Sequence, residues 1–539
     1  MESCTAPRER HIAACRQLAR HMEQAAFAGR RVYRTLWEAM VSTGRSFTGM
    51  GWALADATGQ RLSRRQLVFR ALLLADILRD PLPAAPAPVG VLLPTSVAGV
   101  VTLFALQARG WLPAMINFAS GIEPMVQACR SANIRVIITA RIFVAKAGLQ
   151  PAVERLAAEG RVLYLEDLRA VVGPMHWLRA GVAALSPLRA HRRATPWLRN
   201  EHPALLMFTS GSEGIPKGVL LSHLNLLANC AQVATRLDFS AHDTLLNVLP
   251  LFHTFGLTMG TLAPLFAGMR VHLLPSPLDY DGVPALIHAM KITVLAGTDT
   301  FLFGYGRVAH PQDFASLRFV FAGAEPLRDR TRALWLDKFG LRVLEGYGTT
   351  ETSPVLSVNA PFACRAGSVG PLLPGIEHRL EPVAGLARGG RLWVRGANIM
   401  LGYLTTDSAT RGVTAGWYDT GDVVEIDAEG FLSIVGRAKR FAKIGGEMVS
   451  LVVTESLACT VWPDAQHAAI ARPDPQKGEQ IILVTTAPSA QRSQLLAHAR
   501  AAGLGEIHLP RRILFIEQMP LLGVGKIDYA AVRDYAETS

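Results

Sequence analysis

The stretch that most constrains the fold is a polar loop set between two apolar runs. Residues 204–208 (ALLMF) lead into TSGSEGIPKG at 209–218, and VLLS follows at 219–222. This order predicts a strand, a loop and a second strand, and it differs from the common P-loop because Pro216 precedes Lys217 and no helix follows directly. Hydroxyls, closely approaching backbone N–H groups and one lysine can hold a polyphosphate. A solvated Ser/Gly turn is the alternative. The candidate phosphate-binding residues are Thr209, Ser210, Gly211, Ser212, Gly214 and Lys217.

Other polar turns follow short apolar runs in the same way. Residues 245–251, 292–297, 319–322 and 343–345 read as buried strands, and such strands alternate with helical patterns. This alternation predicts a doubly wound α/β core, in which ligands gather outside the carboxyl ends of the strands. The turns after these runs supply His253, Thr298, Gly323, Ala324, Glu325, Gly346, Tyr347, Gly348, Thr349, Thr350 and Glu351. Because Glu351 adjoins two hydroxyls, it suits Mg²⁺, which binds few carboxylates plus phosphate oxygens.

In this order the motifs resemble those of the adenylate-forming (AMP-binding) superfamily, which includes acyl-CoA synthetases, peptide-synthetase adenylation domains and luciferases. The sequences of residues 249–257, 344–348 and 437–444 are similar to the synthetase half of bacterial bifunctional 2-acylglycerophosphoethanolamine acyltransferase/acyl-[acyl-carrier-protein] synthetases. The resemblance implies a large domain of doubly wound sheets with a small β-barrel-like subdomain, followed by a small mobile α+β lid. We expect a basic amphipathic segment at 1–45, the large domain at 46–438 and the lid at 439–539.

The resemblance also implies a role for each candidate residue. Lys526 corresponds to the catalytic lysine of adenylation, and Glu351 to the Mg²⁺ residue, with Thr209 and Lys217 also catalytic. Asp422 and Arg437 join the nucleotide contacts of the loop at 209–217, of 323–325 and of 346–350. His253 and Thr298 border the carboxylate substrate. Lys439 is the hinge, and Lys443, Gly445 and Gly446 line the approach of the thiol in the second half-reaction.

Composition limits the remaining possibilities. The 539 residues are 50% hydrophobic, which is ample for a multidomain core, and the six cysteines show no metal spacing. Residues 88–108 carry no charge, but they read as a strand, a turn and a helix rather than a membrane span. The start lacks a signal-peptide pattern, so we expect a cytoplasmic protein, peripheral at the inner face of the membrane as an open alternative.

The net charge of +12 favours an acidic partner such as a carrier protein or an anionic lipid surface, and no nucleic-acid motif is present. A helical stripe of Ile12, Cys15, Leu18, Ala19 and Met22 predicts a helix packed on the domain, with membrane or partner attachment as the alternative. Residues 168–200 hold six arginines, no acidic residue and several large apolar side chains. They predict a membrane-surface or carrier-docking segment or, equally, a solvated basic linker.

The resemblance, with weak support from the basic charge, therefore implies a ligase that uses ATP and Mg²⁺ to activate a medium- or long-chain fatty acid and passes it to acyl carrier protein. Coenzyme A is the alternative acceptor, and an aryl or other carboxylic acid the alternative substrate. No histidine is followed by Asp five residues later, so the acyltransferase half is not expected in this chain. A luciferase-like oxidation and a silent binding protein are further alternatives. The presence of Lys217, Glu351, Asp422, Arg437 and Lys526 together argues against the silent one.

Overall fold

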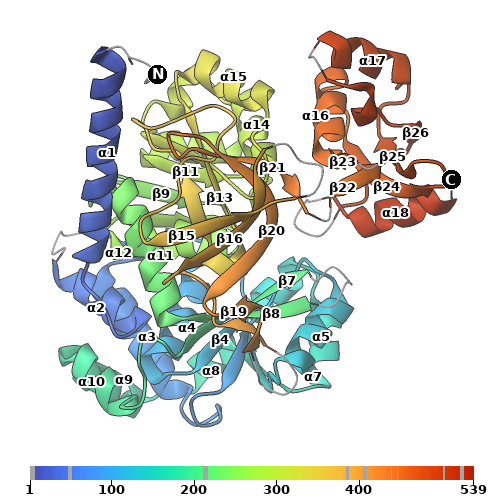
Figure 1. The fold of residues 1–539 in the computed structure, drawn as a ribbon. Coiled ribbons are helices and arrows are strands. Elements are labelled where there is room, and N and C mark those ends of the chain that lie inside the picture. Colours follow the sequence, from blue (N-terminus) through green and yellow to red (C-terminus); the bar gives the residue numbers. More distant parts are fainter. Residues whose placement is uncertain are drawn as a thin grey trace. The chain divides into compact units, whose positions relative to one another are not determined.

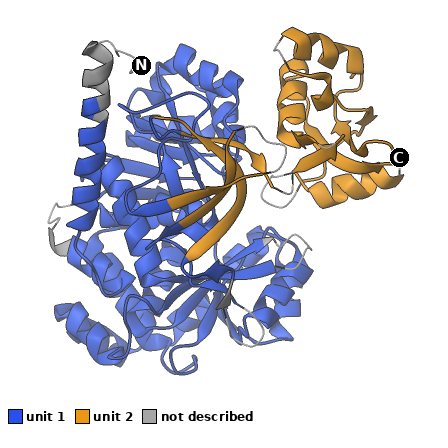
Figure 2. Cartoon of the chain, viewed as in Figure 1, with its two compact units in different colours: residues 1–377, 395–416, 429–431 blue, residues 378–394, 417–428, 432–539 orange. Residues whose placement is uncertain are grey.

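The computed structural model describes residues 7–46, 51–210, 216–383, 388–404, 410–438, 440–445, 447–501, 504–521 and 527–538. The chain divides into two compact units, coloured separately in Figure 2. Unit 1 comprises residues 1–377, 395–416 and 429–431, and unit 2 comprises 378–394, 417–428 and 432–539. This division by packing differs from the boundary expected at 438/439. The functional hinge at Lys439 lies outside the described residues and stays a prediction.

The first sheet of unit 1 is an eight-stranded, mainly parallel sheet, and several predicted site residues follow its strands. Three of its strands, β9, β11 and β13, are labelled in Figure 1. Neighbouring strands are parallel from β1 to β13, while β2 and β14 pair antiparallel at the two edges. Its order is β14 (Val355–Val358), β13 (Val343–Gly348), β12 (Phe319–Ala322), β11 (Val294–Gly297), β9 (Thr244–Asn247), β10 (Arg270–Leu273), β1 (Leu54–Asp56) and β2 (Arg61–Leu62).

The second eight-stranded sheet of unit 1 carries the polar loop. Parallel strands β6, β5, β3, β4 and β7 are extended by the antiparallel strands β8, β17 and β18. Its order is β18 (Thr410–Arg411), β17 (Gly402–Leu404), β8 (Pro216–Ser222), β7 (Pro203–Ser210), β4 (Leu112–Met115), β3 (Pro88–Val91), β5 (Val136–Thr139) and β6 (Arg161–Tyr164).

Helices cover these sheets because their apolar stripes pack on the buried strands. One core cluster around the first sheet includes Trp335, Tyr305 and Phe314, which are at most 1% exposed. The helices of unit 1 are α1 (Pro7–Ala28), α2 (Leu36–Ser46), α3 (Arg64–Ile77), α4 (Val97–Arg109), α5 (Ile122–Ser131), α6 (Arg141–Lys146), α7 (Gln150–Ala157), α8 (Leu165–Ala170), α9 (Pro174–Leu185), α10 (Pro187–Ala194), α11 (His223–Arg236), the π-helix η1 (Phe255–Leu262), α12 (Ala263–Phe266), α13 (Gly282–Met290), α14 (Asp299–Val308), the 3₁₀ helix η2 (Pro311–Phe314), α15 (Asp329–Phe339) and the 3₁₀ helix η3 (Thr350–Thr352).

Unit 2 contains strands of two further sheets and a helical layer. One five-stranded sheet has the order β15 (Ile376–Glu381), β16 (Gly390–Gly396), β20 (Trp417–Ile426) and β19 (Val413–Thr414), with β21 (Leu432–Arg437) paired to β20. Of these, β19 and the residues 376–377 and 395–396 are assigned to unit 1. The other has the order β23 (Glu447–Ser450), β22 (Phe441–Ile444), β25 (Gly478–Thr485) and β24 (His467–Asp474), with β26 (Arg512–Phe515) paired to β25. Its helices are α16 (Leu451–Val461), α17 (Arg492–Ala501), the 3₁₀ helix η4 (Glu506–His508) and α18 (Tyr529–Thr538).

The uncharged stretch at 88–108 forms strand β3 and helix α4, as predicted, and α4 is buried along most of its length. No helix within the described ranges is both long and apolar enough to span a membrane. The run at 245–251 is shorter as a strand than predicted. It ends at Asn247 because the Asn247 side chain turns onto the backbone, where its Oδ1 accepts from the N–H of Leu249 at 3.0 Å.

One expectation about the basic segments was wrong, and one of two open alternatives is excluded. The apolar stripe of α1 does not pack on the domain, because Leu18 and Met22 are 60% and 64% exposed. Instead α1 is held by its last turns, where Glu23 Oε1 accepts from Arg236 Nε at 2.6 Å and Phe27 is buried. Residues 168–200 are not a solvated linker, because most of them fold into helices α8, α9 and α10.

Candidate active site

The polar loop is bordered by the two strands that the sequence predicted. Strands β7 and β8 pair antiparallel, with Thr209 opposite Lys217 and Ser210 opposite Pro216. This register brings the hydroxyl residues at the end of β7 level with the lysine at the start of β8. Residues Gly211, Ser212 and Gly214 lie outside the described residues. The described part therefore places one lysine and two hydroxyl residues at one end of a hairpin.

Glu351 lies in a buried 3₁₀ turn beside this hairpin. Turn η3 begins after Thr349 and contains Thr350 and Glu351. The Glu351 carbonyl accepts from the N–H of Met400 at 2.8 Å, and Asn398 Nδ2 donates to the Thr352 carbonyl at 2.9 Å. Asn398 is fully buried. These bonds fix the backbone of the turn, so the carboxylate of Glu351 has little freedom to move.

The Glu351 side chain is 8% exposed and is held by a tyrosine from the neighbouring strand. Tyr403, on β17, donates its hydroxyl to Glu351 Oε1 at 2.7 Å. Strand β17 pairs with β8, and Lys217 Nζ lies 5.5 Å from the centre of the Tyr403 ring. Register and hydrogen bonding thus connect Lys217, Tyr403 and Glu351 in one array.

This array fits a divalent cation. A buried carboxylate is costly unless a cation or several donors compensate its charge. In the part of the chain that the structure describes, no lysine or arginine forms an ion pair with Glu351. Magnesium binds through one or two carboxylates together with phosphate oxygens. Glu351 would hold Mg²⁺ and Lys217 would face the phosphates, and both roles remain predictions.

Three predicted nucleotide positions converge at the ends of β12 and β13. A Cβ atom at Gly323 would lie 3.1 Å from the ring of Phe255 and 3.6 Å from the carbonyl oxygen of Gly346. At Gly348 a Cβ would lie only 1.7 Å from the carbonyl oxygen of Pro354, so glycine is required there. Tyr347, which lies between Gly346 and Gly348 on β13, is partly exposed.

The turn after β12 continues with Ala324 and Glu325. Ala324 has a left-handed backbone, with φ of 68°. The Glu325 carboxylate accepts from both the N–H and the hydroxyl of Thr300, at 3.2 and 2.9 Å. Thr298 precedes helix α14, is 9% exposed, and its Oγ1 has no hydrogen-bond partner among the described residues. An orphan buried hydroxyl of this kind fits contact with a bound substrate.

His253 lies just before the π-helix η1. Its ring packs against Phe252 with centroids 5.0 Å apart, and it is partly exposed. Asn247 Nδ2 donates to the carbonyl of Gly256 at 2.9 Å and to Thr261 Oγ1 at 3.1 Å, which holds the wide turn of η1 open. Short π-helices occur frequently at functional sites. The predicted contact of His253 with substrate stays a prediction.

In unit 2 two predicted residues form an ion pair. Strands β20 and β21 place Asp422 opposite Arg437, and Arg437 Nε lies 3.1 Å from Asp422 Oδ1. The Asp422 side chain is 4% exposed and that of Arg437 is 68% exposed. Thr420 Oγ1 accepts from the N–H of Asp422 at 3.1 Å. A buried carboxylate held in this way can accept from ribose hydroxyls, as the resemblance implies.

The predicted loop for the thioester step belongs to a β-hairpin of unit 2. Lys443 is exposed on β22, and Gly445 follows that strand with φ of 61°. The N–H of Gly445 donates to the carbonyl of Lys477 at 2.8 Å. Lys439, Gly446 and the predicted catalytic Lys526 lie outside the described residues, so their roles stay predictions.

Sequence reasoning missed Tyr403, Asn398 and Asn247. Tyr403 is 52 residues from Glu351 in the chain, and only the pairing of β17 with β8 brings them together. Asn398 and Asn247 are buried amides that read as ordinary loop residues in the sequence. A buried asparagine is detectable only once the backbone groups that it bonds are known.

Comparison with known proteins shows the family of this chain. Residues 47–404 match the model of the AMP-binding enzyme family. The chain belongs to that family. It is 31% identical over 379 residues to a long-chain-fatty-acid–CoA ligase of Yersinia pestis, covering 67% of each chain. It is 33% identical over 345 residues to a feruloyl-CoA synthase of Amycolatopsis sp., covering 61% of this chain and 69% of that one.

The fold agrees as well. The crystal structure of ATP-bound MatB from Rhodopseudomonas palustris superposes with a TM-score of 0.76 at 25% identity, covering 92% of this chain and 98% of that chain. Several of the curated fatty-acid ligases are matched over only 62–63% of their own length. Family membership and fold make the chain an adenylate-forming ligase of the AMP-binding family. The predicted fold class and cofactors are confirmed, whereas the likeness to acyl-carrier-protein synthetases is not.

Proposed function

We propose that this chain activates a medium- or long-chain fatty acid as its acyl-adenylate and transfers the acyl group to the thiol of coenzyme A. The observation that carries the proposal is the array of Lys217, Tyr403 and Glu351 in a member of the AMP-binding family. The fatty-acid and coenzyme A assignment is supported by the likeness to long-chain-fatty-acid–CoA ligases.

The chemistry has two steps. A carboxylate oxygen attacks the α-phosphorus of ATP, the bond to the bridging oxygen breaks, and pyrophosphate leaves with that electron pair. The thiol then loses its proton and attacks the acyl carbon, which forms the thioester and releases AMP. Bound Mg²⁺ supplies charge neutralisation on the phosphate oxygens.

The protein's own groups position the reactants. Thr209, Ser210 and Lys217 would hold the outer phosphates, and Asp422 would accept from the ribose hydroxyls. Lys526 would contact both the incoming carboxylate and the α-phosphate. Phosphoryl transfer needs mainly positioning and charge stabilisation, which these groups would provide. The reaction calls for no protein nucleophile. Cys129 and Cys230 are buried, and burial raises the pKa of the Cys129 thiol to about 12.

Acyl carrier protein is a second candidate acceptor. The net charge of +12 favours an acidic carrier, and from residue 440 onward ten basic and ten acidic residues balance, so the excess lies in the preceding part. An aryl acid is a second candidate substrate, because the feruloyl-CoA synthase is as similar in identity as the fatty-acid ligases. Contact with an anionic membrane surface also belongs to the proposal.

Single-turnover transfer of radiolabelled acids tests these assignments. The enzyme is mixed with ATP, Mg²⁺ and labelled octanoate, palmitate or ferulate, and then with coenzyme A or holo-carrier protein. We expect palmitoyl-CoA to form fastest, and Lys526→Ala to abolish adenylate formation. Faster labelling of the carrier would replace coenzyme A in the proposal, and faster use of ferulate would replace the fatty acid. Without pyrophosphate release from any acid, the adenylation proposal itself would fail.

A further inference from the structure

Helix α9 presents an apolar stripe to solvent. Met175, Leu178, Val182 and Leu185 are spaced by three, four and three residues, so they lie on one face of the helix. Their exposed fractions are 54%, 61%, 62% and 84%. Amphipathic helices on a folded domain normally turn such a stripe toward the core. Contiguous exposed apolar side chains of this kind mark an interaction surface.

The other face of α9 is fixed to the domain, so the stripe cannot turn inward. Ala180 is 1% exposed, and Trp177 stacks on Phe69 of α3 with ring centroids 5.6 Å apart. His176 Nδ1 lies 3.0 Å from Oδ2 of the buried Asp76, also on α3. The outward direction of the stripe is therefore built into the packing of α9 on α3.

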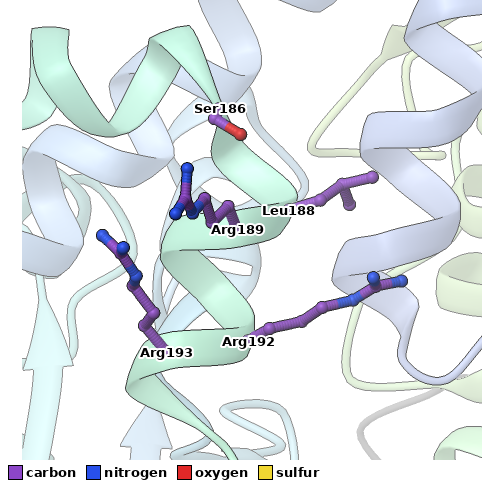
Figure 3. Close-up of a pocket in the computed structure, with 5 residues that line it drawn as sticks. All are labelled: Ser186, Leu188, Arg189, Arg192 and Arg193. Atoms are coloured by element: carbon purple, nitrogen blue, oxygen red, sulfur yellow. The ribbon is translucent and has the colours of Figure 1, made fainter.

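Helix α10 adds positive charge where the stripe ends. Ser186 alone separates Leu185 from α10, and the hollow lined by Ser186, Leu188, Arg189, Arg192 and Arg193 has a volume of about 460 Å³ (Figure 3). Arg192 pairs with Glu38 of α2. Figure 3 shows Arg189 and Arg193 reaching to the other side of α10 from Leu188 and Arg192.

The charge of this surface is not compensated locally. Residues 169–200 contain six arginines and no carboxylate. Arg189 and Arg193 are exposed, and within the described ranges neither forms an ion pair with an acidic side chain. The nearby carboxylates Asp76 and Glu38 are buried and already bonded to His176 and Arg192. An occupant must therefore offer negative charge next to apolar surface.

We propose that α9 and α10 dock this protein on an anionic phospholipid bilayer. The α9 stripe enters the boundary between headgroups and acyl chains, and Arg189 and Arg193 bind headgroup phosphates. An interfacial helix of this type combines a buried apolar face with basic residues that anionic lipids attract. An acidic carrier protein would satisfy the two arginines but would also need an apolar groove that fits the α9 stripe, whereas a bilayer accepts an apolar stripe of any shape. This inference deepens the proposed function and rests on it in one respect. Fatty acids partition into bilayers, so docking on a bilayer would bring the enzyme to its proposed substrate.

The test is co-sedimentation of the full chain with vesicles of phosphatidylcholine, with and without 30% phosphatidylglycerol. We expect binding to the anionic vesicles only, weakened by added salt because screening acts on the arginines. The double variant Arg189→Gln/Arg193→Gln should bind about 30-fold more weakly. The affinity of the triple variant Leu178→Ser/Val182→Ser/Leu185→Ser for anionic vesicles should fall at least about tenfold.

Two matched controls keep the test specific. Ile142→Ser/Leu278→Ser removes two apolar side chains that are each 64% exposed outside α9 and α10, and Arg135→Gln/Arg161→Gln removes the same charge from exposed sites beside β5 and at the start of β6. Both should bind vesicles like the unchanged protein. Equal losses in the controls, or full binding by the α9 and α10 variants, would overturn the proposal. So would reduced transfer to holo-carrier protein with vesicle binding intact, because that result assigns the surface to the carrier.

Failure of the docking proposal and failure of the proposed function are separable. Vesicle binding is measured without ATP or acid, so it does not depend on catalysis. Octanoate activation is measured without vesicles and should be the same in all four variants. Loss of vesicle binding with normal octanoate activation is the expected result for the α9 and α10 variants.

Discussion

The Glu351 turn and helix α9 depart from the usual distribution of side chains in opposite ways. At the Glu351 turn a carboxylate is buried to 8% exposure, with a tyrosine hydroxyl as its hydrogen-bonding partner. On α9 four aliphatic side chains that would stabilise the fold if buried lie in solvent instead. Neither arrangement stabilises the folded state. Burying a charge removes its hydration, which is unfavourable, and an apolar stripe left in solvent contributes no hydrophobic stabilisation.

The difference between them points to what each region contacts. A buried carboxylate needs a small cation that can enter a fixed site, so its neighbours are rigid and its geometry is set by hydrogen bonds. An exposed stripe needs a large apolar partner, so only its inner face has to be fixed. Substitutions at the Glu351 turn should therefore change catalysis but not membrane binding, and substitutions on α9 should change membrane binding but not catalysis. Neither the catalytic loss nor the binding loss should come from a loss of stability.

The largest expected effect is on catalysis at the buried region. Glu351→Gln keeps the shape of the side chain but removes its charge, so the phosphate charge would be less well neutralised. We expect the adenylation rate to fall by about 10²–10³, the usual cost of losing one charge-stabilising group. Pyrophosphate release in a single turnover measures it.

If the Glu351 turn and α9 are independent, Glu351→Gln should bind vesicles like the unchanged protein, because α9 and α10 are not altered. A variant that adenylates at the normal rate would remove Glu351 from the catalytic site. One that also fails to bind vesicles would show that the two regions are not independent.

A second effect concerns the buried end of strand β8. His223 follows β8 directly, is 1% exposed, and its Nδ1 accepts from the N–H of Leu36 at 3.2 Å. Burial, with His191 and His202 nearby, lowers the pKa of His223 to about 3. The unfolded chain binds the proton near pH 6.5 and the folded chain does not, so stability falls as pH drops below 6.5 toward 3.

Between pH 6.5 and 5, His223 alone should cost the folded state roughly 1.5–2 kcal/mol. His223→Asn keeps an acceptor near the position of Nδ1 and removes the titration, so its urea midpoint should vary less over this range. Burial also lowers the pKa of His191, which contributes in the same direction in both proteins. An identical pH dependence of the two urea midpoints would contradict the assignment to His223.

Tyr403→Phe should have a smaller effect, because it leaves the Glu351 charge in place and removes only the hydroxyl that orients it. Groups that orient a metal ligand typically contribute about 10–100-fold in metal affinity or activity. We expect the Mg²⁺ concentration for half-maximal adenylation to rise about tenfold, with a smaller change at saturating Mg²⁺. Equal losses at low and high Mg²⁺ would mean that Tyr403 acts on something other than the cation site.

The two regions also differ in how far the sequence could predict them. The strands around the polar loop and the strand and helix at 88–108 followed from short apolar runs and turn residues, which are local signals. The Glu351–Tyr403 contact depends on β17 pairing with β8, so it requires a register that no local pattern contains. The division into two units also depends on contacts between distant segments. Residues 378–394 and 417–428, which hold most of strands β15, β16 and β20, group with residues 432–539.

For α9 the sequence showed the apolar side chains but not their direction. A helical period identifies a stripe and leaves open whether the domain lies on that face or the opposite one. Asp76 and Phe69, about one hundred residues earlier, decide it through His176 and Trp177. On α1 the same uncertainty led to the wrong prediction, because Glu23 and Phe27 hold the helix while its stripe faces solvent.

The smallest expected effect sharpens the comparison most directly. Leu178→Ser on α9 removes an aliphatic side chain that is 61% exposed, so the free energy of unfolding should change by no more than about 0.5 kcal/mol. The matched Leu103→Ala on α4, where Leu103 is 1% exposed, should cost about 2–5 kcal/mol. Urea unfolding followed by tryptophan fluorescence measures both. If Leu178→Ser destabilised the protein by as much as Leu103→Ala, the α9 stripe would be part of the core in solution, and its availability to a bilayer would be refuted.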